Sequence, residues 1–297
     1  MTIDIRDKSH ISHEDIIQLN FIRDVGPYVF RKYHKQGLRS QIMEVLDRQD
    51  VVKQANGERI NGVLFFPWAN PIKILRIFRS GFNSKEEVFE EIKKLKIVEK
   101  YLPPDSYAKS IEFIVDYIRD GTPNLVLCGL QDYIEGEALN PWKLNKKNDL
   151  AELFNRMKVA RRHLLEMTME QFIERVKKNV KIFIQSTKKM ILEANYVPDF
   201  AGVENLILTP SGNIKLVDIN NISKVSFESP ISLDDKGYPV CDKSIEAISM
   251  LEQALFEKVF DKTEKIYRIF LDPQRMKEVK ALEEKFHFSM GFGEHYP

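Results

Sequence analysis

The sequence has few cysteines and no long apolar segment. Two cysteines, Cys128 and Cys241, occur in 297 residues, and they stand in no metal-binding or redox spacing. This composition argues against a disulfide-stabilised secreted protein and favours a reduced, cytoplasmic setting. No apolar run approaches the ~20 residues that span a bilayer, and the first ten residues contain no apolar signal core. The sequence therefore predicts a protein without a membrane span.

An excess of charge of either sign is also missing. With 45 basic and 44 acidic residues, the formal net charge is +1, so nothing indicates a nucleic acid or a membrane surface as partner. Hydrophobic residues make up 43% of the chain, which excludes an intrinsically disordered protein. The sequence contains no internal repeat and no low-complexity tract. Its length is sufficient for one large domain or two lobes with buried cores.

The hydrophobic pattern predicts a β-rich half followed by a helical half. Residues 11–48 are expected to be mainly helical. Strands are expected at 51–55, 58–66, 71–78, 110–117 and 124–133, with Asn56-Gly57 as the first turn and a helix after Ser84. Helices are then expected at 150–164, 169–194, 244–260 and 274–287, followed by a loose tail over 291–297.

One segment of the helical half predicts a β-hairpin. Two apolar runs, 206–208 and 214–217, flank the sequence Thr-Pro-Ser-Gly-Asn at 209–213, which suits a type I turn. With the turn centred on its Ser and Gly, Asn205 would lie opposite Asp218 and share its face. An amide oxygen and a carboxylate would then converge. Such oxygen ligands suit Mg²⁺, whose coordination substrate phosphates can complete.

Two simpler interpretations of this hairpin stay open. Asn and Asp at strand ends commonly do no more than hydrogen-bond the turn backbone. A register shift of one residue would also turn the side chains of Asn205 and Asp218 to opposite faces. A third oxygen-bearing side chain, Asp199, is expected close by in the loop before the hairpin.

The segment resembles the catalytic core of the protein-kinase-like superfamily. In that family, a loop with a catalytic Asp and a metal-binding Asn precedes a short hairpin and the Asp of a DFG-type motif. Asn205 matches the loop Asn, and Asp218, in Val-Asp-Ile-Asn at 217–220, matches the DFG Asp. The sequence NLILTPSGNIKLVDIN is especially similar to the bacterial small-molecule and aminoglycoside kinases. The order of expected elements resembles the family over about residues 50–260.

The resemblance implies an α+β, bilobal kinase-like fold with a β-rich N-lobe and a mainly helical C-lobe. It divides the chain into a helical extension at 1–48, an N-lobe at 49–133 and a C-lobe at 134–297, with the catalytic-loop hairpin at 195–223. The linker 131–139 resembles the kinase hinge. The backbone around Gln131 and Tyr133 would then meet the adenine of ATP.

The family also uses a basic residue on the third strand, held by a helix Glu. Glu91 resembles that Glu and borders the apolar stripe of its helix, although a surface Glu paired with a neighbouring Lys is equally consistent. Lys73 has a family-like separation from Glu91, whereas ILRIFR aligns with the family pattern VLKVFR and puts Arg76 in the Lys position. Lys73 and Arg76 point to opposite faces of a strand, so one of them at most can face a nucleotide.

The catalytic loop departs from the family pattern. Phe200 occupies the place of the catalytic Asp, five residues before Asn205, and Asp199 lies one residue earlier. Either the loop has one extra residue and Asp199 is the catalytic base, or the base is missing. No GxGxxG stands between the first strands, and Asn220 replaces the DFG glycine.

These observations predict an ATP- and Mg²⁺-dependent phosphotransferase that acts on a hydroxyl of a small molecule or an atypical acceptor. Asp199 would be catalytic, and Asn205 and Asp218 would be metal ligands. The first alternative is a pseudokinase, a nucleotide-binding or purely regulatory module with a protein partner and no transfer activity. The second is an unrelated α+β interaction protein whose hairpin mimics the motif.

Overall fold

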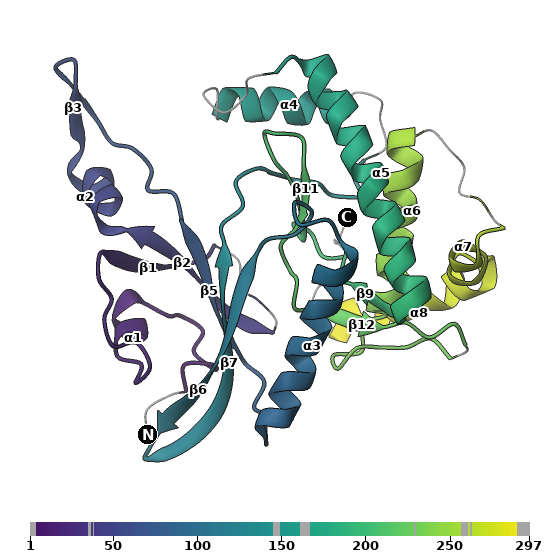
Figure 1. The fold of residues 1–297 in the computed structure, drawn as a ribbon, viewed down its shortest axis with the longest axis horizontal. Helices are drawn as coiled ribbons and strands as arrows, with labels where there is room; N and C mark the ends of the chain where they lie inside the picture. The colour runs from purple at the N-terminus through teal and green to yellow at the C-terminus, as the bar shows by residue number, and fades with distance from the viewer. Residues whose placement is uncertain are drawn as a thin grey trace. The chain divides into compact units, whose positions relative to one another are not determined.

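The computed structural model describes residues 4–34, 37, 39–144, 149–160, 167–228, 230–256, 261 and 263–289. It is a mixed α+β protein that divides into two compact units (Figure 1). The first unit comprises Met1–Lys93 and Lys109–Tyr133, and the second comprises Lys94–Ala108 and Ile134–Pro297. The tail expected at 291–297 lies outside the described residues.

The first unit is built on a five-stranded antiparallel sheet. Its strands are β1 (Tyr28–Lys32), β2 (Ser40–Asp47), β5 (Lys73–Phe78), β6 (Ser110–Arg119) and β7 (Thr122–Asp132), in the order β1-β2-β5-β7-β6. The expected strands at 71–78, 110–117 and 124–133 are confirmed as β5, β6 and β7. The expected helix after Ser84 is confirmed as α3 (Lys85–Tyr101), which connects β5 to β6.

Successive side chains of β5 pack on opposite faces of this sheet, as the strand period requires. Leu75 and Ile77 belong to one apolar cluster, which also contains Ile16 of α1 (His13–Ile17). Phe78 belongs to a second cluster with Val88 of α3. The sheet is therefore covered on both faces, which is why its central strands consist largely of apolar residues.

The N-terminal residues do not form the expected helical extension. The helix α1 is short, and strands β1 and β2 lie where residues 11–48 were expected to be mainly helical. The helical interpretation was wrong because β2 is buried along most of its length, so its apolar residues do not alternate cleanly with polar ones. These residues belong to the first unit together with the rest of its sheet.

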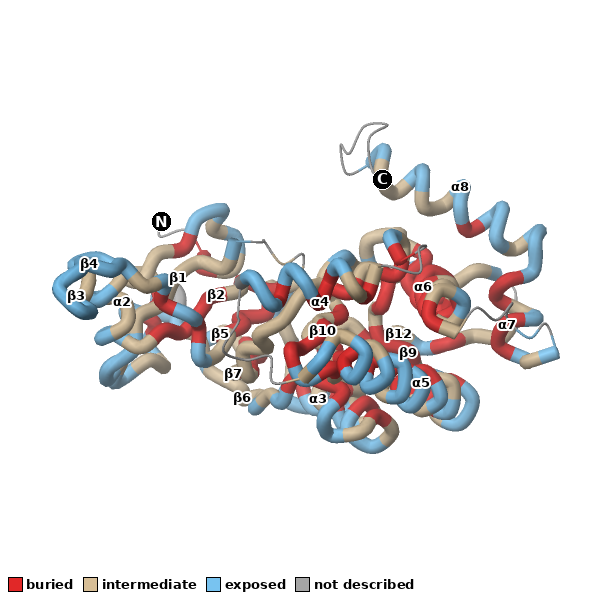
Figure 2. The backbone as a smooth tube through the Cα atoms, turned by 90° about the horizontal axis from the view of Figure 1, so that it is seen from above, coloured by how far each residue is buried: buried red, intermediate tan, exposed pale blue. Residues whose placement is uncertain are grey.

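The expected strand at 51–55 is also wrong. It lies in helix α2 (Arg48–Asn56), which the side chain of Asp47 caps by accepting a hydrogen bond from the Gln49 amide at 2.7 Å. The hairpin turn lies instead at Asn61-Gly62, between β3 (Glu58–Ile60) and β4 (Val63–Phe65). Both turn residues have positive φ, which matches a type I′ turn. Figure 2 shows most of this hairpin exposed.

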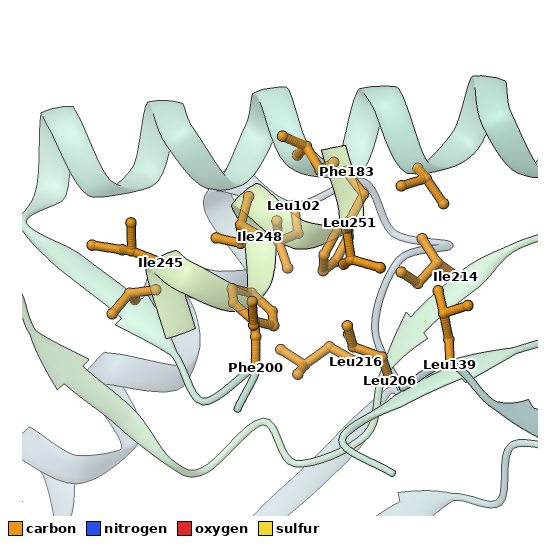
Figure 3. Packing of buried hydrophobic residues seen from close by; sticks show 14 of the residues in the cluster. Leu102, Leu139, Phe183, Phe200, Leu206, Ile214, Leu216, Ile245, Ile248 and Leu251 are labelled. Atoms are coloured by element: carbon orange, nitrogen blue, oxygen red, sulfur yellow. The ribbon is translucent and has the colours of Figure 1, made fainter. Parts of the chain in front are cut away.

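The second unit contains most of the helices. These are α4 (Asp149–Ala160), α5 (Met169–Ala194), α6 (Val240–Phe256), α7 (Lys265–Phe270) and α8 (Pro273–Ser289). A capping box between Thr168 and Gln171 begins α5, and Asn195 ends it in a left-handed conformation. The apolar face of α5 packs into the main hydrophobic core (Figure 3). In the described part of the chain, no helix is both long enough and apolar enough to cross a membrane.

Candidate functional site

The predicted hairpin is present, but its register differs from the expected one. Strands β10 (Leu206–Leu208) and β11 (Ile214–Leu216) pair Leu206 with Leu216. Val217, and not Asp218, therefore follows opposite Asn205, and the Val217 amide donates a hydrogen bond to the Asn205 carbonyl oxygen at 2.9 Å. The direct pairing of Asn205 with Asp218 was wrong by one residue, and this register does not place their side chains on one face of the hairpin.

The turn explains this shift. The Gly212 amide donates to the Thr209 carbonyl at 2.9 Å, and the Thr209 amide donates to the Asn213 carbonyl at 2.9 Å. Thr209 and Asn213 are thus the last hydrogen-bonded pair, and three residues form the loop between them. Gly212 has a φ of +77°, which glycine adopts without steric cost. A three-residue loop of this kind, with a type I turn followed by a left-handed residue, adds one residue to a two-residue hairpin.

A second pair of short strands positions Asp199. Strand β9 (Tyr196–Pro198) pairs with β12 (Ile222–Lys224), so that Asp199 directly follows one strand and Asn221 directly precedes the other. The Asp199 amide donates to the Asn221 carbonyl at 2.8 Å, and Asn221 Nδ2 donates to Asp199 Oδ2 at 2.9 Å. The sequence analysis missed Asn221, because strands of three residues carry too little periodicity to be recognised.

The loop that follows Asp199 closes on the same carboxylate. Asp199 Oδ1 accepts hydrogen bonds from the amides of Ala201 at 2.9 Å and Gly202 at 3.1 Å. Phe200 is fully buried and packs edge-on against Phe183 of α5, with ring centroids 5.5 Å apart (Figure 3). Phe200 therefore belongs to the hydrophobic core, and Asp199 is the carboxylate that the loop presents.

The Asn205 side chain is hydrogen-bonded to the backbone of the same loop. Its Nδ2 donates to the Asp199 carbonyl oxygen at 2.9 Å, whereas its Oδ1 accepts no hydrogen bond from the residues that the structure describes. Gly202 lies directly against this side chain, because a Cβ at Gly202 would come within 2.8 Å of Asn205 Cγ. The amide is thus held with its nitrogen toward the loop backbone, and its oxygen is left as an available ligand.

Opposing effects act on the pKa of the Asp199 carboxyl group. Burial raises the pKa of Asp199 to about 6, and the negative charge of Asp218 contributes to the increase. The hydrogen bonds from Gly202, Ala201 and Asn221 act in the opposite direction, because they stabilise the charged carboxylate. Asp199 and Asp218 are therefore close enough to repel each other, and a cation bound between them would reduce this repulsion.

A Mg²⁺ site that phosphates complete stays a prediction for these residues. Within the described ranges, no group of three or more His, Cys, Asp or Glu side chains is placed to hold a metal ion. Mg²⁺ needs no such group, since it is commonly bound through one or two carboxylates, with phosphate oxygens and water as its other ligands. Asn205 and Asp218 remain the predicted ligands, and Asp199 links them through its carbonyl and its charge.

In the first unit, the two candidate cations have different surroundings. Lys73 forms an ion pair with Asp132, its cross-strand neighbour on β7, and both side chains are about 40% exposed. Arg76 is only 4% exposed and lies on the other face of β5, the face that packs against α3 at Phe78. The prediction that the two side chains point to opposite faces agrees with this packing.

Arg76 forms a buried ion pair across three strands. The register places Arg76 beside Gly129 of β7, and Gly129 beside Glu112 of β6. Arg76 Nη2 lies 3.9 Å from Glu112 Oε1 and donates to Ser110 Oγ at 3.5 Å. The absence of a side chain at Gly129 leaves space for this pair. The sequence analysis missed Glu112, although an acidic residue inside an apolar strand was a visible signal.

The other predicted positions of the first unit lie on α3 and at the end of β7. Glu91 is partly buried on α3, three residues after the buried Val88. Gln131 is buried within β7, opposite Ile74 and Ser110. Tyr133 directly follows this strand.

Part of the expected linker in the second unit is a strand. Strand β8 (Glu137–Ala138) pairs with β10 and extends the hairpin to a three-stranded sheet. A Cβ at Gly136 would overlap the Leu208 carbonyl, so only glycine permits this close approach. The linker thus adds a strand to the sheet of β10 and β11, and Asn205 directly precedes β10.

Comparison with known proteins finds no matching family model and no matching curated protein. No family assignment follows from these comparisons, and the resemblance to kinases stays a prediction.

The contact between Gly202 and Asn205 can be tested by substitution. We expect Gly202→Ala to reduce the free energy of unfolding by about 1–3 kcal/mol, because the new methyl group displaces the Asn205 amide from the Asp199 carbonyl. Urea unfolding measures this change. Gly81→Ala is the control, since the atom nearest to a Cβ at Gly81 lies 3.8 Å away. An equal effect of the two substitutions would contradict the proposed contact.

Proposed function

We propose that the chain is an ATP- and Mg²⁺-dependent phosphotransferase that acts on a hydroxyl group of a small molecule or an atypical acceptor. One observation supports this proposal above the others. The Asn205 side chain is anchored to the Asp199 carbonyl through its nitrogen, and Asp218 is close enough to Asp199 to raise the pKa of that carboxyl. An amide oxygen in this loop and the Asp218 carboxylate close to the same loop suit a Mg²⁺ ion and the phosphates that accompany it.

Distinct roles are proposed for Asn205, Asp218 and Asp199. Asn205 and Asp218 bind Mg²⁺, which supplies neutralisation of phosphate charge when it is bound. Asp199 orients the acceptor hydroxyl and accepts its proton. A pKa raised to about 6 suits this role, because the carboxylate is charged at neutral pH but is a stronger base than an ordinary Asp.

The proposal extends to a kinase-like, bilobal fold. The five-stranded antiparallel sheet, with α3 between its third and fourth strands along the chain, supports it. In the β-rich unit the phosphate-binding role stays open between Lys73, which is exposed and paired with Asp132, and Arg76, which is buried and paired with Glu112. Glu91 on α3 keeps the acidic role that the resemblance gives it. The backbone at Gln131 and Tyr133 is proposed to bind adenine.

One observation favours a pseudokinase as the second candidate. The Asp199 carboxylate accepts three hydrogen bonds from its own loop and from Asn221. A carboxylate held in this way also has a purely structural use, as the cap of an irregular loop. In that case the protein would bind nucleotide, a protein partner or both, and it would transfer no phosphate.

Asp199→Asn separates the two candidates. Asn can keep the hydrogen bonds from Ala201 and Gly202 and loses only the one from Asn221 Nδ2, so we expect the loop to stay folded and stabilisation by Mg²⁺ and ATP to persist. Turnover should fall about 10²–10⁴-fold, because the substituted side chain cannot accept the proton. A thermal shift detects binding, since ATP at about 100 times its Kd adds about 2.7 kcal/mol to the unfolding free energy.

The matched control is Asp105→Asn, which changes an exposed Asp of the same unit. It should leave both binding and turnover as they are in the wild type. Wild-type turnover in Asp199→Asn would remove the catalytic role of Asp199. A wild-type protein that binds ATP but shows no turnover would favour the pseudokinase. If Mg²⁺ and ATP do not stabilise the wild type at all, the proposed function is overturned.

A further inference from the structure

The hairpin β3–β4 and the segment after it present a continuous apolar sequence to solvent. Val63 is 68% exposed, Trp68 is 66% exposed and Phe66 is 55% exposed. The residues of this apolar hairpin surface are Ile60, Val63, Leu64, Phe65, Phe66 and Trp68. Figure 2 shows most of both strands in the colour of exposed residues. None of these six residues belongs to the hydrophobic clusters found among the described residues.

The hairpin is also incomplete as a sheet. Strands β3 and β4 pair only with each other among the described strands, so each has an outer edge whose backbone groups bond to no further strand. The register places Ile60 beside Val63 on one face, and Phe65 lies two residues further along the same face. A two-stranded hairpin is marginally stable in water by itself, and a free edge with an apolar face is a template for another strand.

The exposed area is large enough for a stable interface. Three of the six side chains are aromatic, at about 150–250 Å² each when fully exposed. The six together, each exposed by about half to two thirds, leave on the order of 600 Å² in contact with water. The largest apolar patch on a monomer typically measures about 300–600 Å². A standard interface buries about 800 Å² on each partner, so this surface and its polar margin would suffice.

The charges around the surface favour a second copy of the chain over a polyanion or an anionic membrane. The Arg31 guanidinium lies 4.4 Å from the centroid of the Trp68 ring and pairs with Glu44, and Lys53 Nζ lies 3.6 Å from Glu58 Oε2. A carboxylate therefore offsets each of these two basic groups. Such a margin attracts neither nucleic acid nor acidic lipid, and it does not repel an identical surface.

We propose that the apolar hairpin surface is the interface of a homodimer, in which β4 of one copy pairs antiparallel with β4 of the other. A two-fold axis makes such a contact self-complementary, because the same edge serves both copies. The result is a four-stranded sheet with Val63 and Phe65 of both copies on one face. This inference is independent of the proposed phosphotransferase activity, because it concerns residues with no role in that activity.

The experiment is to measure the mass of the full chain in solution by sedimentation velocity and light scattering over a concentration series. The wild type should reach twice the 34.7 kDa of one chain. The double variant Val63→Lys/Phe65→Lys should stay at the mass of one chain, because paired strands would bring four lysines together. Both positions are exposed, so the circular dichroism spectrum should match that of the wild type.

Ile111→Lys is the matched control. Ile111 is 69% exposed on β6 of the same unit and lies outside the hairpin, so this variant should dimerise like the wild type. Slower amide hydrogen exchange in β4 of the wild type than in the double variant would support strand pairing. A wild type that stays monomeric at every concentration overturns the proposal. So does a double variant that still dimerises, or a wild type that binds acidic phospholipid vesicles as a monomer.

Discussion

We expect Asp218→Asn to reduce Mg²⁺-dependent ATP turnover about a thousandfold, which is the effect of removing one strong electrostatic contact to transferring phosphate. The substitution keeps the size of the side chain but removes the only carboxylate charge that is proposed to bind Mg²⁺. Stabilisation by Mg²⁺ and ATP in a thermal shift should weaken in parallel. Both changes follow from the position of Asp218 beside Asp199.

In the protein without ligands, the same substitution should not reduce the stability of the fold. The charge of Asp218 contributes to the raised pKa of Asp199, so the folded state holds the ionised Asp199 less favourably than the unfolded state does. The resulting loss of folding free energy is absent below about pH 4, grows as the pH rises toward about 6 and is complete above about pH 6. At neutral pH, Asp218→Asn should therefore unfold at the same urea concentration as the wild type, or at a higher one.

This combination of retained stability and lost activity distinguishes a functional residue from a structural one. Asp105→Asn serves again as the control and should change neither property. Turnover that Asp218→Asn leaves intact would show that Asp218 is not a metal ligand. A variant that loses both turnover and fold stability would show that Asp218 supports the loop, and the metal site would then lack its main evidence.

The second large effect is expected in the sheet of the first unit. Arg76→Ala should reduce the free energy of unfolding by about 3–5 kcal/mol, because it leaves the Glu112 carboxylate buried without its ion-pair partner. The side chains are 5% and 7% exposed, so water cannot replace the lost contact without a rearrangement of the sheet. Urea or thermal unfolding of the purified variant measures this loss.

A double variant separates the pair from its surroundings. Arg76→Met/Glu112→Leu should recover most of the lost stability, because apolar side chains of similar volume remove both buried charges together. Lys73→Ala is the control, since the exposed pair of Lys73 and Asp132 is expected to contribute about 0–1 kcal/mol. If Arg76→Ala costs no more than Lys73→Ala, the buried pair is not an important contribution to the stability of the sheet.

Some of the candidate site could be predicted from local sequence. Proline and glycine in 209–213 indicated the hairpin, and oxygen-bearing side chains at both of its ends indicated a site for a cation. Asp199 was recognised as part of the loop, although Phe200 stood where the kinase pattern has its Asp. The hydrogen bonds of Asn221 and Asn205 to Asp199 could not be predicted, because they depend on the pairing of β9 with β12 and on the path of the loop.

Elements with strong local signals could be recognised from the residue pattern alone. Helix α5 has an uninterrupted apolar stripe and a capping box, and strands β5 to β7 have apolar runs bounded by turns. The other features depend on long-range packing. Strand β2 is buried, so its pattern did not distinguish strand from helix. The left-handed Gly212 set the hairpin register. The partner of Arg76 lies two strands away, and a pairing across a sheet depends on strand order, which local periodicity does not encode.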